Sequence, residues 1–173
     1  MAMDFNEVII GFDLGRNSSV LTFYHQNNTE PKTVSAVAGE EKYQIPTPRD
    51  LFPLIEQKVE LGAALLSNFF KVCFEKLSAV GPMSGAVVMV TMAEMRRDWV
   101  QAIRQALEML GIPKDKVYLQ DYLESFYYYA LSQKKDLWRY KVGLFSYEED
   151  FITGYELHIN GKTKPAMVSV KNR

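Results

Sequence analysis

The pattern of apolar positions predicts strands in the first part of the chain and helices after them. β-branched and aromatic residues gather in three short runs, at residues 8–12, 19–24 and 33–37. Turn-rich segments separate these runs, as is typical of an antiparallel meander. A connecting region with three prolines follows, and apolar residues then recur at helical spacing from residue 61 to residue 77. The sequence therefore predicts three strands followed by a helix.

Strand and helix signals alternate in the middle of the chain. The continuous apolar run 86–90 predicts a central parallel strand that is covered on both faces. Thr91 and Glu94 have the spacing of a capping box, which predicts that the second helix begins there and ends before Gly111. A strand is expected at 116–120, and a third helix after it. This order predicts a mixed α/β sheet with helices on its faces.

A second set of strand signals follows near the C-terminus. The runs lie at residues 141–145, 152–159 and 166–170. Asn160 and Gly161 form a tight-turn dipeptide between the last two runs. We therefore expect two regions, an α/β lobe over residues 1–138 and, over residues 139–173, the first three strands of an incomplete second lobe.

Composition and charge narrow the function classes. The 173 residues are 47% hydrophobic and carry a formal net charge of -1, which gives no electrostatic case for nucleic acid or for a membrane surface. The single cysteine, Cys73, cannot form an intramolecular disulfide, and no apolar run reaches the roughly 20 residues that span a bilayer. We expect a cytoplasmic protein that binds neither nucleic acid nor membrane.

The first hairpin carries the candidate chemistry. Residues 10–15 read Ile-Gly-Phe-Asp-Leu-Gly, so an apolar strand runs into a turn that holds one carboxylate and two glycines. Backbone amides in such a turn can face a phosphate. An alternative interpretation is a polar hairpin in which glycine supplies a positive φ.

Together with the element order, this hairpin resembles the first lobe of the actin, sugar-kinase and heat-shock-chaperone ATPase superfamily. The resemblance implies a ribonuclease-H-like sheet of three meander strands and two parallel strands with flanking helices. It also implies that Asp13 orients a magnesium-bound water and that ATP or ADP with Mg²⁺ is the ligand, unless the site has lost its ligand altogether. The nucleotide-binding residues would be Gly11, Asp13, Leu14, Gly15, Arg16, Asn17 and Ser18.

A second match to the superfamily lies at the strand that ends in Asp121. The resemblance implies that this carboxylate is catalytic and helps to position the attacking water. The residue types alone favour another role, because aspartate at a strand-to-helix junction is a preferred N-cap, with Glu124 as its companion.

The expected second phosphate hairpin departs from the superfamily pattern. Ser146 stands where the superfamily has aspartate, and acidic residues replace its glycines at 148–150. A carboxylate about 4 Å from a phosphate charge costs on the order of a few kcal/mol near a protein surface. We therefore expect a degenerate nucleotide-binding module, a pseudo-enzyme that acts through protein interaction. The alternatives are a fragment of a true ATPase whose second lobe lies beyond Arg173, and a ligand-free scaffold.

The incomplete second meander leads to an expectation about partners. Three strands without following helices leave an apolar face and unpaired edges. We expect a protein partner, or self-association, through these C-terminal strands.

Overall fold

The computed structural model describes residues 8–25, 27–80, 83–133, 141–148, 151–158 and 166–172. The chain divides into two compact units, Met1–Gln120 and Asp121–Arg173. Each unit is described by itself. The lobe boundary expected after residue 138 stays a prediction.

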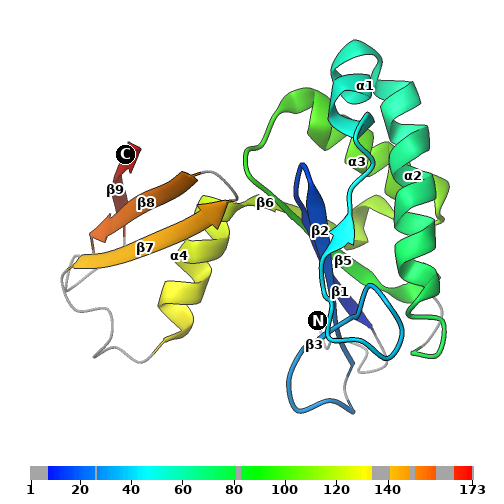
Figure 1. The fold of residues 1–173 in the computed structure, drawn as a ribbon, viewed down its shortest axis with the longest axis horizontal. Helices are drawn as coiled ribbons and strands as arrows, with labels where there is room; N and C mark the ends of the chain where they lie inside the picture. Colours follow the sequence, from blue (N-terminus) through cyan, green and yellow to red (C-terminus); the bar gives the residue numbers. More distant parts are fainter. Residues whose placement is uncertain are drawn as a thin grey trace. The chain divides into compact units, whose positions relative to one another are not determined.

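A mixed sheet forms the centre of the first unit (Figure 1), in the order β3-β2-β1-β5-β6 with β4 beside β2. β1 pairs antiparallel with β2 and parallel with β5, which confirms the predicted α/β class and the parallel strand at its centre. The strands are β1 (Ile9–Leu14), β2 (Ser18–Tyr24), β3 (Lys32–Thr33), β4 (Ile45–Pro46), β5 (Val87–Met92) and β6 (Val117–Asp121).

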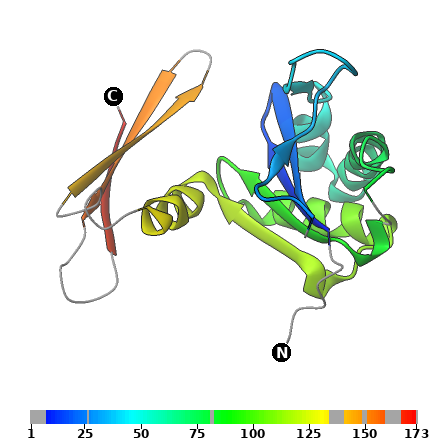
Figure 2. The same cartoon turned by 90° about the horizontal axis from the view of Figure 1, so that it is seen from below.

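Three helices cover one face of this sheet (Figure 2), namely α1 (Leu51–Gln57), α2 (Val59–Glu75) and α3 (Arg97–Met109). Burial alternates along β1, so Ile10, Phe12 and Leu14 face the helices and are almost fully buried. The Phe12 ring meets Phe70 of α2 edge to face, with centroids 4.9 Å apart. This packing fixes which side of β1 faces the core.

The opposite face of the sheet is more exposed. Met89 in β5 is 36% exposed and Ile9 in β1 is 39% exposed, whereas Val88 and Val90 are fully buried. The prediction that residues 86–90 are covered on both faces was therefore wrong. The apolar run alternates between a packed face and a half-open one.

Three local predictions also needed correction. β3 has two residues, shorter than the strand expected at 33–37. α3 begins at Arg97, because Thr91 pairs with β1 inside β5 and cannot cap a helix. α1 was missed because of its proline, yet Pro53 lies in the first turn, where a missing N–H costs no intrahelical bond. The expected end of α3 is confirmed, since Gly111 follows it with a φ of 76°.

The described residues of the second unit form one helix and an antiparallel sheet in the order β7-β8-β9. The Phe126 ring of the helix lies 5.5 Å from the Tyr155 ring of the sheet. The predicted strands are confirmed, and the first and third end later than expected, at Glu148 and Asn172. The Asn160-Gly161 turn lies outside the described residues. The elements are α4 (Tyr122–Ser132), β7 (Lys141–Glu148), β8 (Phe151–His158) and β9 (Ala166–Asn172). Among the described residues, no helix is long and apolar enough to cross a membrane.

Candidate functional site

The β1–β2 hairpin turns through Gly15, Arg16 and Asn17, between the register pair Leu14 and Ser19. A Cβ at Gly15 would collide with the backbone carbonyl oxygen of Ser18. Gly15 is not among the glycines with positive φ. The interpretation that this glycine supplies a positive φ was therefore wrong, and close backbone approach within the turn requires it.

Thr47, just before α1, holds the turn from the side. Its amide donates to the Asn17 carbonyl at 2.9 Å, and its hydroxyl donates to the Gly15 carbonyl at 2.8 Å. The Ser19 hydroxyl lies 2.8 Å from the same Thr47 oxygen, and both residues are buried. Because the single Thr47 proton goes to Gly15, Ser19 must donate to Thr47. Sequence reasoning missed Thr47, since nothing local signals a partner some 30 residues away.

The structure places the predicted ligand residues on two different sides of the sheet. Asp13 alternates with buried Phe12 and Leu14, so it lies on the face away from the helices, in register with Thr91 of β5. The Arg16 guanidinium lies on the helix side, 5.1 Å from the Trp99 ring centroid. Asp13 and Arg16 are therefore not brought together.

The other members of the predicted set are placed as follows. Gly11 shares the Asp13 face, where a Cβ would collide with Thr22 Oγ1, and this hydroxyl donates to the Gly11 carbonyl at 3.2 Å. Cross-strand packing thus accounts for Gly11 without a ligand. Leu14 is 2% exposed and belongs to the core. Ser18 is half-buried at the start of β2.

A pocket of about 570 Å³ opens beside the turn on the helix side. It collects two arginines, an amide, a hydroxyl, one aromatic ring and two prolines. The lining residues are Arg16, Asn17, Pro46, Thr47, Arg49, Phe52 and Pro53. The lining set therefore carries two positive charges and no carboxylate.

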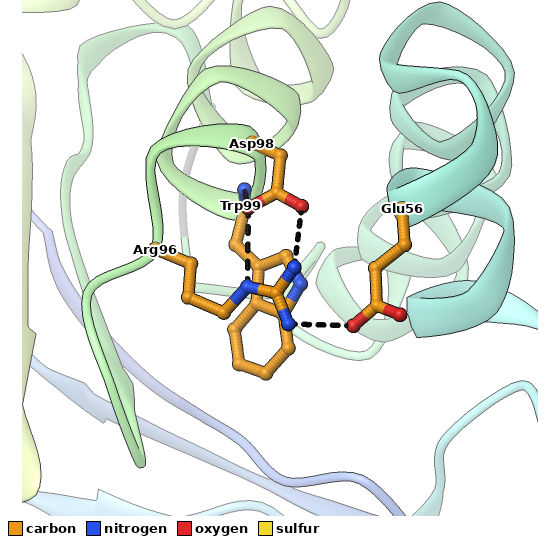
Figure 3. A network of polar contacts seen from close by, with 4 residues as sticks. All are labelled: Glu56, Arg96, Asp98 and Trp99. Atoms are coloured by element: carbon orange, nitrogen blue, oxygen red, sulfur yellow. Dashed lines mark hydrogen bonds and ion pairs between the residues drawn. The ribbon is translucent and has the colours of Figure 1, made fainter.

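A network of polar contacts surrounds Arg96 (Figure 3). The Arg96 guanidinium lies 5.1 Å from the centroid of the Trp99 ring. Its nitrogens bond Asp98 at 3.0 and 3.3 Å and Glu56 at 2.9 Å. The hydrogen bond with Asp98 is the main reason that the pKa of Arg96 is raised above its ordinary value. Two carboxylates thus pair with Arg96, whereas Arg16 contacts the same indole ring from the pocket.

Asp121 ends β6 and caps α4. Its Oδ1 accepts a hydrogen bond from the Glu124 amide at 2.7 Å. The N-cap interpretation is confirmed, and the catalytic role implied by the superfamily stays a prediction. Across the described residues there is no group of three or more His, Cys, Asp or Glu side chains that could hold a metal ion.

The counterpart hairpin belongs to the second unit. β7 and β8 pair Ser146 with Thr153 and Glu148 with Phe151. The acidic residues 149 and 150 lie outside the described residues. The predicted loss of a second phosphate loop therefore stays a prediction based on residue types.

Residues 54–173 match the family model described as "Family of unknown function (DUF5716) C-terminal". The chain belongs to this family. No curated protein matches the DUF5716 chain.

Solved structures similar to the DUF5716 chain include a Ppx/GppA phosphatase of Aquifex aeolicus, with 11% identity and a TM-score of 0.46 over 96% of this chain and 52% of that one. An exopolyphosphatase of Cytophaga hutchinsonii matches with 12% identity and a TM-score of 0.39 over 96% and 50%. The DUF5716 chain spans about half the length of these enzymes. We assign the fold class from the strand order alone, because structural similarity with so low an identity and TM-score carries no argument.

Proposed function

We propose that the first unit binds the phosphates of a magnesium nucleotide on the Asp13 side of the sheet and does not hydrolyse it efficiently. The observation that carries this proposal is the position of Asp13 near the carboxyl end of β1, in register with Thr91 on the parallel neighbour β5. In open α/β sheets, ligands bind outside the carboxyl ends of the strands. Here that edge presents a carboxylate beside a hydroxyl.

The turn that follows Asp13 supports the proposal by its rigidity. Thr47 holds the carbonyls of Gly15 and Asn17, and the Gly15 backbone packs against the Ser18 carbonyl. A turn held at both ends presents its backbone to a ligand without a large ordering cost.

The donor set near Asp13 fits magnesium held through water. Mg²⁺ usually keeps several waters and takes only one or two protein carboxylates together with substrate phosphates. A single carboxylate at Asp13 meets this need, and the lack of a three-ligand cluster among the described residues argues against a metal held by protein groups alone. The ion would neutralise phosphate charge while Asp13 orients its water shell.

Two features argue for weak hydrolysis. Asp121 already uses one carboxylate oxygen to cap α4. Ser146 and the acidic residues 148–150 stand where the superfamily has the aspartate and the glycines that contact the outer phosphates. The unit would then act as a nucleotide-dependent binding module for a protein partner or for a second copy of the chain.

Thermal unfolding with Mg-ATP and with Mg-ADP tests the proposal. A ligand at 100 times its dissociation constant stabilises the native state by about 2.7 kcal/mol. We expect this stabilisation in the wild-type chain and its loss in Asp13→Asn, which removes the charge but keeps the shape. Thr91→Val tests the neighbouring hydroxyl in the same way.

Asp115→Asn provides the matched control. Asp115 is exposed before the start of β6, so the variant makes the same charge change far from the carboxyl edge. Absence of any stabilisation at millimolar nucleotide would contradict the proposal, as would equal stabilisation of the wild type and Asp13→Asn.

The second candidate function is a true ATPase whose second lobe lies beyond Arg173. The second unit favours it, because the described part of that unit contains a three-stranded meander and one preceding helix. This candidate predicts phosphate release from a longer chain and its loss in Asp13→Ala. A longer chain that binds nucleotide but releases no phosphate would exclude it.

A further inference from the structure

We propose that the pocket beside the turn is a second, magnesium-independent site, which binds a phosphate-bearing small molecule between Arg16 and Arg49. This inference goes beyond the proposed function, because the pocket lies on the helix side of the sheet and Asp13 lies on the other side.

The first argument is the uneven distribution of charge around Trp99. Three arginines lie near α1 and the start of α3, but the carboxylates of Glu56 and Asp98 both bond Arg96. Among the described residues, no ion pair involves Arg16 or Arg49, although Asp50 follows Arg49 in the chain. The pocket therefore concentrates positive charge in a chain whose formal net charge is -1.

The second argument is that Arg16 is held in place before any ligand arrives. Its guanidinium carbon lies 5.4 Å from the Phe52 ring centroid and 5.1 Å from that of Trp99. Both rings belong to buried residues, so they form a fixed surface for the cation. Contact with two rings restricts the guanidinium, and its planar set of N–H donors matches phosphate oxygens in pairs.

The third argument is the size and lining of the pocket. Its volume of about 570 Å³ lies within the range of small-molecule sites. The Asn17 amide adds a polar group to the two arginines, and Phe52 with the prolines supplies an apolar wall. An open pocket of this size suits a molecule with one or two phosphate groups and a small apolar part.

Calorimetric titration of pyrophosphate into the full chain, in EDTA and without magnesium, tests this site. We expect saturable binding that weakens tenfold or more in Arg16→Gln and in Arg49→Gln. Arg16→Lys should recover only part of the affinity, because lysine keeps the charge and loses the paired donors. Emission from Trp99 gives a second readout, since its ring contacts Arg16.

The control variant is Arg104→Gln, an exposed arginine of α3 that does not line the pocket. Equal weakening in this variant would show non-specific charge attraction and overturn the inference. So would the absence of binding at 10 mM pyrophosphate, on the order of the weakest affinity that matters for a small ligand. Succinate that binds as tightly as pyrophosphate would overturn the phosphate assignment.

Asp13→Asn separates this site from the proposed function. It should abolish the stabilisation by magnesium nucleotide and leave the affinity for pyrophosphate in EDTA unchanged. Without magnesium the Asp13 carboxylate repels an anion beside it. Tighter pyrophosphate binding in Asp13→Asn, with unchanged binding in Arg49→Gln, would therefore place the anion on the Asp13 side and refute the second site.

Discussion

Replacing Thr47 by valine should loosen the turn of the β1–β2 hairpin. The Thr47 hydroxyl donates to the Gly15 carbonyl and accepts from Ser19, each at 2.8 Å. Valine keeps the shape of the side chain and removes both interactions. Gly15 is half-buried, so water can replace one of them, whereas Ser19 is 0% exposed and its hydroxyl loses the Thr47 oxygen as its acceptor.

The magnitude follows from this difference in burial. Leaving the buried Ser19 hydroxyl without its partner costs about 1 to 3 kcal/mol. The Gly15 carbonyl adds little to this cost, because water can reach it. We therefore expect Thr47→Val to lower the free energy of unfolding by about 1 to 3 kcal/mol. Urea unfolding should show this as a lower midpoint with an unchanged slope.

Two further variants isolate the hydrogen bond. Thr47→Ser keeps the hydroxyl and should keep most of the stability that Thr47→Val loses. The double variant Thr47→Val with Ser19→Ala should lose about 1 kcal/mol less stability than the sum of the losses in the two single variants, because both substitutions remove the same interaction. A Thr47→Val chain within about 0.5 kcal/mol of the wild type, or strictly additive losses, would refute this reasoning.

Three other predictions follow from the described residues. Gly15→Ala should destabilise the first unit by about 1 to 3 kcal/mol in thermal unfolding, because its methyl group collides with the Ser18 carbonyl, and an unchanged midpoint would contradict this. Asp121→Ala should cost about 1 kcal/mol through loss of the cap to Glu124, while Asp121→Asn should cost little; equal losses in urea unfolding would exclude the cap as the cause. Burial raises the pKa of Cys73 from 9.0 to about 11, with Lys76 opposing it, so this contribution to stability is complete below pH 9.0 and is lost as the pH rises through about 11. Cys73→Ala should therefore lose less stability than the wild type as the pH rises. Identical pH profiles of the free energy of unfolding in the two proteins would contradict this.

The strands of the first unit could be predicted because their signals are local. β-branched and apolar runs define β1, β2, β5 and β6, and these strands follow one another along the chain in the predicted order. The start of α3 could not be predicted in this way. Thr91 and Glu94 have the spacing of a capping box, but pairing of Thr91 with β1 extends the strand and overrides the local preference.

The helix α1 shows the opposite error. Proline in the connecting region was interpreted as a sign of irregular structure, yet Pro53 lies where a helix tolerates it. The burial of Leu51, Phe52 and Ile55 stabilises this short helix through contacts with the rest of the core. Such tertiary contacts leave only a weak pattern in seven residues.

The candidate site was predictable only in part. The position of Asp13 at the end of a strand follows from the sequence pattern, and so does the cap at Asp121. The direction of Arg16 does not, because it depends on Phe52 and Trp99, which are far away along the chain. The role of Thr47 depends in the same way on a bond that spans 32 residues.

The most direct test of the central claim is a calorimetric titration of Mg-ADP into the wild-type chain and into Asp13→Asn under identical conditions. The account predicts saturable binding to the wild type that depends on magnesium and weakens at least tenfold in the variant, a difference of about 1.4 kcal/mol. Equal affinity in the two proteins, or no binding to the wild type at millimolar Mg-ADP, would contradict it.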